Sequence, residues 1–223
     1  MRKRFLQLSW LQLYVRTIGP MPNHKIRAGG VAVLVAAILF LAGARPCLGS
    51  PERGQVGLRA LFMPSGTFEL GYGGGTSRAP AIPALGLSPY VDFSVTRYLL
   101  VGVATELLLN VLPDIWPYPG GTTMLNVTVR MVGVAPLTTR LSCYGVVAGG
   151  YSAMFANGIG NPRGPVLEGA VGVTFTVWGR NAVFGEVGYQ VGFQRAHPGP
   201  NDMQFGQYAA RYLQTGFGWQ YAF

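Results

Sequence analysis

The sequence predicts an all-β fold: a closed, antiparallel, up-and-down transmembrane β-barrel of about eight strands. Three observations predict this fold class. Apolar residues recur at every second position after residue 50, and this is the period of a β-strand. The segments between these strands are alternately long and short. Charged residues make up only 11% of the chain, whereas about 25% is usual in soluble domains.

Residues 1–49 are predicted to form a signal peptide region rather than part of the barrel. A basic stretch precedes an apolar run at 31–44, which is shorter than the roughly 20 residues that a membrane-spanning helix needs. Small residues suited to cleavage follow, up to Gly49. A signal peptide of ordinary length would begin at Met21, which indicates an over-long start. The barrel is then expected over 50–223, and a membrane-anchoring helix is the alternative for the apolar run.

The positive charge of the chain does not indicate nucleic-acid binding. The formal net charge is +9, but many of the basic residues precede the expected barrel. From Ser50 onward there are ten arginines and eight acidic residues, a net charge of +2, and the arginines form no cluster in the sequence. Nucleic-acid partners need a basic patch, so we expect none.

Eight segments alternate apolar with polar or small residues and are predicted to be strands. In the first of them Pro64 interrupts the pattern, and we expect a bulge at Pro64-Ser65-Gly66 within one long strand. The alternation keeps the same parity on both sides of Pro64, which predicts that Phe62 and Phe68 share a face. The eight segments are 56–72, 85–95, 99–110, 125–134, 141–152, 166–177, 183–193 and 208–223.

The connections between these segments sort by length. Transmembrane barrels have short turns at the periplasmic end and longer loops at the extracellular end, and a strict alternation of long and short connections predicts this arrangement. The short connections lie around Thr96-Arg97, at 135–140 and at 178–182. The long connections are 73–83, 111–122, 153–164 and 194–207.

The two faces of the predicted strands differ in charge. One face is almost uncharged, whereas the other carries acidic and basic residues among glycines and other small residues. A soluble barrel would turn its apolar face inward, but the chain has no lysine after Lys25 to cover a soluble exterior. We therefore predict an apolar exterior in lipid and a lumenal charge network in which arginines neutralise acids. Its members are Arg59, Glu69, Asp92, Glu106, Arg130, Glu168 and Glu186.

The last ten residues, "QTGFGWQYAF" at 214–223, carry an aromatic residue at every second position. The chain here resembles the small outer-membrane β-barrels: the transmembrane domain of OmpA and the OmpX- and OmpW-like proteins. The resemblance spans about 52–223, and its specific motif is the terminus, where Gly218, Tyr221 and Phe223 match the signal for the barrel-assembly machinery. It implies a place in the bacterial outer membrane, among outer-membrane lipid and lipopolysaccharide. It implies no ligand.

Aromatic residues in the long connections are the candidate contacts with a surface ligand, because loops on a rigid scaffold carry recognition. The alternative for them is a girdle at the lipid interface. The residues are Trp116, Tyr118, Phe155 and Phe205.

Few residues suited to catalysis remain after signal-peptide cleavage. One cysteine, Cys143, and one histidine, His197, would be left, so we expect no metal site, no cofactor and no catalytic residues. We predict a non-enzymatic structural or surface-interaction role through four extracellular loops. A narrow channel for small or apolar solutes is the alternative. A lipid A-modifying enzyme is a third hypothesis, which would have to use His197.

Overall fold

The computed structural model describes residues 54–72, 75–81, 83–109, 111, 122–155, 161–195 and 207–223. The predicted signal peptide region, Met21 included, lies outside this part of the chain, as do Trp116, Tyr118, His197 and Phe205. Within the described residues no helix is long and apolar enough to cross a membrane.

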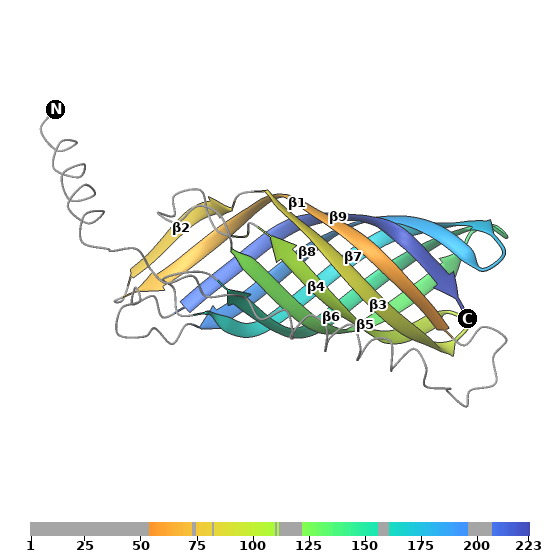
Figure 1. Ribbon diagram of the computed structural model, residues 1–223, viewed down its shortest axis with the longest axis horizontal. Coiled ribbons are helices and arrows are strands. Elements are labelled where there is room, and N and C mark those ends of the chain that lie inside the picture. The colour runs from red at the N-terminus through yellow and green to blue at the C-terminus, as the bar shows by residue number, and fades with distance from the viewer. Residues whose placement is uncertain are drawn as a thin grey trace, which may run out of the picture. The chain divides into compact units, whose positions relative to one another are not determined.

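The described part of the chain forms a single antiparallel sheet (Figure 1). Its strands are β1 (Gly54–Tyr72), β2 (Gly75–Ala81), β3 (Ala84–Thr96), β4 (Leu99–Leu109), β5 (Thr123–Pro136), β6 (Leu141–Phe155), β7 (Arg163–Trp178), β8 (Asn181–Arg195) and β9 (Gln207–Ala222). From β3 to β9 each strand pairs with the next, and β1 pairs with β9 to close the sheet.

The closed barrel has eight strands around its circumference, because β2 and β3 both pair with the same edge of β1, one after the other along its length. β3 pairs with the first half of β1, from Gly54 to Met63. β2 pairs with the second half, from Gly66 to Tyr72. The predicted closed antiparallel barrel of eight strands is therefore confirmed. The long connection predicted at 73–83 does separate β1 from β3, but the prediction missed that it contains a strand, β2. That segment has no apolar alternation, and backbone pairing with β1 holds it.

The described connections between β3 and β4, β5 and β6, and β7 and β8 are all short and lie at one end of the barrel, which we call the turn end; the opposite end is the loop end. Gly179, in the turn between β7 and β8, has a φ of 53°, which glycine adopts without strain. The first residue of β1 and the last residue of the chain also meet at the turn end, where the Phe223 amide donates a hydrogen bond to the Gly54 carbonyl (2.9 Å).

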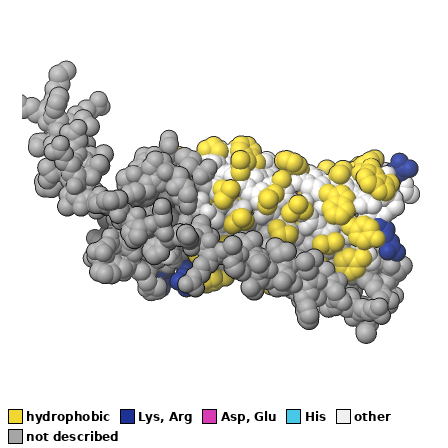
Figure 2. All heavy atoms as spheres, viewed as in Figure 1, with side chains coloured by type: hydrophobic (Ala, Val, Ile, Leu, Met, Phe, Trp, Pro, Cys, Tyr) yellow, Lys and Arg dark blue, Asp and Glu magenta, His cyan; other side chains and the backbone are white. Residues whose placement is uncertain are grey.

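Side chains alternate between a lipid-facing exterior and a packed interior. Val127, Val173 and Tyr189 point outward with 46%, 49% and 49% of their surface exposed, whereas Glu106 and Arg130 point inward with 0% and 4% exposed. Figure 2 shows apolar side chains spread over the outside of the strands. The predicted orientation of apolar and charged faces is therefore confirmed.

The first strand contains the predicted bulge. The pairing of β1 with β9 shifts between Phe62 and Ser65. The extra residue reverses the faces beyond it, because side chains alternate with a strict period of two. Phe62 is 40% exposed, but Phe68 is fully buried. The expectation that Phe62 and Phe68 share a face is wrong.

Candidate functional site

A buried charge network crosses the middle of the barrel, centred on Arg59 of β1. Its guanidinium lies 2.7 Å from Glu168 Oε1 and 2.5 Å from Glu186 Oε1, and it also forms an ion pair with Glu106. We call these four residues the central network. Their strands are β1, β4, β7 and β8, so the network connects opposite walls of the barrel. At most 8% of any of these residues is exposed.

Neutral side chains saturate much of the remaining hydrogen-bonding capacity of the three carboxylates. The donors are Asn126 and Gln190 to Glu106 (2.9 and 2.8 Å), Gln214 to Glu168 (2.6 Å) and the Tyr144 hydroxyl to Glu186 (2.9 Å). Buried carboxylates are tolerated when they are paired and hydrogen-bonded in this way. The central network is thus a packed polar layer.

Arg130 and Asp92 form a separate ion pair, with Arg130 Nε 3.1 Å from Asp92 Oδ1. Gln55 donates a hydrogen bond to the other Asp92 oxygen (2.9 Å), and the Arg130 guanidinium carbon lies 4.2 Å from the centroid of the Tyr90 ring. A cavity of about 170 Å³ adjoins this pair and reaches Arg180 in the turn between β7 and β8. Arg130 therefore neutralises Asp92, whereas Arg59 forms the ion pairs with the three glutamates.

Glu69 does not belong to the lumen, and this corrects the predicted network. The bulge in β1 places its side chain on the outer face, where it lies 2.5 Å from Arg78 and 3.4 Å from Arg211. Arg78 and Arg211 side chains are 69% and 39% exposed. The glutamate therefore belongs to a surface cluster near the loop end.

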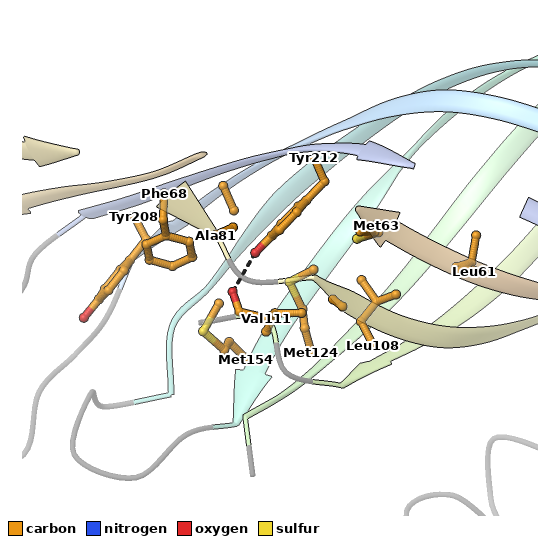
Figure 3. Packing of buried hydrophobic residues seen from close by; sticks show 12 residues of the cluster. Leu61, Met63, Phe68, Ala81, Leu108, Val111, Met124, Met154, Tyr208 and Tyr212 are labelled. Atoms are coloured by element: carbon orange, nitrogen blue, oxygen red, sulfur yellow. Dashed lines mark hydrogen bonds between the residues drawn. The ribbon is translucent and has the colours of Figure 1, made fainter. Parts of the chain in front are cut away.

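A second interior layer, entirely different in chemistry, lies between the central network and the loop end. It is a cluster of buried apolar side chains from seven strands and from Val111, which follows β4 (Figure 3). The Tyr212 hydroxyl donates its hydrogen bond to the Val111 carbonyl (2.7 Å) across this layer, and Phe68 packs edge-on against Tyr208. We call it the apolar layer. Its members are Leu61, Met63, Phe68, Ala81, Ala84, Leu108, Val111, Met124, Met154, Tyr208, Ala210 and Tyr212.

The sequence-based reasoning missed the apolar layer, although a signal for it exists. Inward positions next to the charged residues, on the side of the long connections, are themselves large and apolar. Leu61 follows Arg59 by two residues, and Leu108 follows Glu106 by two. Met124 precedes Asn126 by two. The two-residue period applied along the inward face, rather than only to the outward face, predicts this second layer.

The residues matched to the assembly signal lie where β9 meets β1. Gly218 pairs with Arg59, and a side chain at this glycine would come within 2.7 Å of the Phe184 ring. Tyr221 and Phe223 are half-buried, and the Phe223 ring contacts Phe93 edge-on, with centroids 6.2 Å apart. The C-terminus is therefore part of the barrel wall.

Of the four predicted loop contacts, only Phe155 is described. It is the last residue of β6 rather than a loop residue, and 46% of its surface is exposed on the outer face. Phe155 therefore lies at the loop end on the outside of the barrel, where transmembrane barrels carry an aromatic girdle.

No family model and no curated protein matches this chain. Solved structures that resemble it include Neisserial surface protein A, with 10% identity over 75% of this chain and 97% of that one (TM-score 0.45). OprG from Pseudomonas aeruginosa has 14% identity over 77% and 97% (TM-score 0.45). AlkL in lipid bilayers has 13% identity over 81% and 94% (TM-score 0.45). By its own geometry, with an apolar exterior around an ionised interior, the chain has the fold of an eight-stranded transmembrane β-barrel.

Proposed function

We propose that this chain is a bacterial outer-membrane protein with a closed interior and a non-enzymatic, structural or surface-interaction role. Support for the location comes from the outward apolar face, from the predicted signal peptide and from the C-terminal motif. The long connections at the loop end are the parts that would meet a partner outside the cell.

One observation carries the proposal: two packed layers of different chemistry cross the lumen in series. A solute would first have to separate the apolar layer, where eleven of the twelve residues are at most 2% exposed and the twelfth, Ala81, is 9% exposed. It would then have to part Arg59 from three glutamates. Separating a buried arginine from its partners leaves uncompensated charge, which costs several kcal/mol. Such an interior suits a scaffold rather than a pore.

Single-channel recording tests the closed interior against the narrow-channel alternative. The purified barrel is reconstituted in planar bilayers, with a 16-stranded porin as the positive control for insertion and detection. We expect the porin to give steady openings and this chain to give none. Steady openings by the unaltered chain would support the channel for small solutes and overturn the closed interior.

Two further measurements test the remaining parts of the proposal. Membrane fractionation followed by gel electrophoresis with and without boiling should find the folded barrel in the outer membrane, because folded barrels keep a distinct mobility until heated. Mass spectra of lipid A after overexpression should be unchanged. A new lipid A mass would support the enzyme hypothesis instead.

A further inference from the structure

The described arginines outside the lumen fall into two groups at opposite ends of the barrel. Arg97, Arg140 and Arg180 lie in the short connections at the turn end. Four others lie near the loop end, on the adjacent strands β7, β8 and β9 and on β2. We call these four the arginine rim: Arg78, Arg163, Arg195 and Arg211. The outward faces of β3 to β6 have no charged residue at this end among the described residues.

Two members of the arginine rim face each other directly. Arg163 of β7 and Arg195 of β8 are paired across the strands, and both side chains are exposed. Like charges placed directly opposite each other on a sheet are destabilising. Arg78 and Arg211 share Glu69, but in the part of the chain that the structure describes no carboxylate forms an ion pair with Arg163 or Arg195. The four arginines and Glu69 have a net charge of +3, which favours an anionic partner.

The depth of Arg163 on the barrel follows from the apolar run beside it. Outward positions on β7 from Pro165 to Val177 are all apolar or glycine. At about 3.3 Å per residue this run is about 40 Å long, and a strand tilt of about 40° reduces it to a height of about 30 Å. A bilayer has a hydrocarbon core of about 30 Å. Trp178 marks the far boundary with 65% exposure, so Arg163 lies at the level of the lipid headgroups.

A cavity of about 1000 Å³ lies beside the Arg163–Arg195 pair. Besides the two arginines, Tyr151, Pro165 and Phe193 contribute to its lining. Glu69 also lines the cavity, and Arg78 and Arg211 form ion pairs with its carboxylate. Tyr151 and Phe193 are 56% and 47% exposed. The cavity thus combines guanidinium groups with aromatic and aliphatic surface, which is the chemistry of a lipid headgroup that continues into acyl chains.

We propose that the arginine rim binds the phosphate groups of lipopolysaccharide, with one phosphate held between Arg163 and Arg195. Guanidinium groups bind phosphate through paired hydrogen bonds, and a phosphate between Arg163 and Arg195 would attract both arginines and so offset the repulsion between them. The acyl chains would lie along the apolar outer faces of β7 and β8. The choice of lipopolysaccharide rests on the proposed outer-membrane location, where the loop end faces the outer leaflet.

The test compares two double variants that remove the same charge. R163Q/R195Q alters the arginine rim, and R97Q/R140Q alters two arginines at the turn end. Each barrel is reconstituted in phosphatidylcholine bilayers, alone, with lipopolysaccharide or with enzymatically dephosphorylated lipopolysaccharide. The temperature at which the folded gel band disappears is measured, and native mass spectrometry counts the bound lipid.

We expect lipopolysaccharide to raise the unfolding temperature of the unaltered chain and of R97Q/R140Q. R163Q/R195Q should lose most of that rise and most of the bound lipid, and the dephosphorylated lipid should have little effect on any of them. An equal rise in both double variants, or with the dephosphorylated lipid, would overturn the arginine rim as a phosphate site. Fractionation of cells tests the proposed location independently, because these binding measurements use purified protein.

Discussion

The guanidinium of Arg59 lies 2.5 Å from the carboxylate of Glu186, a residue 127 positions further along the chain. Their strands, β1 and β8, are separated in the barrel by β9. Contacts of this kind exist only after β1 and β9 have paired, because the open sheet would hold β1 and β8 far apart. The central network therefore depends on closure of the barrel and in turn stabilises it.

Removal of the Arg59 charge should destabilise the barrel strongly. Arg59→Met leaves three buried glutamates without their shared cation, and breaking a buried ion pair from one side costs about 3–5 kcal/mol. Urea unfolding in lipid vesicles, followed by tryptophan fluorescence, measures this loss. Arg140→Met, in an exposed turn, is the control and should change the free energy of unfolding little. Equal effects of the two substitutions would contradict the stabilising role of the network.

Gly216 should be required for close packing of the central network. A side chain carbon at this position would lie 2.9 Å from Glu186 Cγ and 3.2 Å from Arg59 Cδ, so Gly216→Ala should cost about 1–3 kcal/mol through overpacking. Gly185→Ala is the matched control, since no atom lies within 4 Å of its added carbon. The same unfolding measurement compares the two, and a Gly216→Ala variant as stable as Gly185→Ala would rule out the predicted crowding.

The length of the bulge in β1 should matter more than the identity of its residues. Deletion of Ser65 would remove the register shift that the bulge introduces between Phe62 and Ser65. The side chain of Phe68 would then point outward, and that of Glu69 would point into the apolar layer. We expect the deletion variant to give no heat-modifiable folded band on gels. Ser65→Ala keeps the chain length and should fold normally. A folded deletion variant with unchanged stability would show that the register of β1 tolerates a slip.

A charge on the outer face should distinguish lipid from water as the surrounding solvent. Val171 is 63% exposed near the middle of the apolar run of β7. In a bilayer, Val171→Arg should cost about 2–4 kcal/mol, the range for arginine at the midplane of a barrel. Leu137→Arg, at a site 58% exposed in a turn, should cost much less. Similar small effects at both positions would indicate that the exterior of the barrel meets water.

The pairing of charges in the lumen illustrates where prediction from sequence ends. The alternation of apolar and polar residues is a local property of each strand. It indicates that Arg59, Glu106 and Glu168, each on its own strand, all point to the inner face of the sheet. Which arginine contacts which acid depends on the register of strands that are distant in the chain. Arg59 contacts three glutamates, whereas Arg130 contacts Asp92. The alternation along a single strand cannot predict these different partners.

The amino-acid sequence by itself determined the eight-stranded barrel, its short turns and the apolar exterior at residues such as Val127 and Val173. These features arise from a two-residue period and from turn residues, which act over a few neighbouring positions. Only the tertiary structure decided that Glu69 lies outside and Phe68 inside, and that Gly75–Ala81 forms β2. One extra residue in a bulge reverses a face, and backbone pairing can hold a strand without apolar alternation, so both outcomes depend on the neighbouring strands.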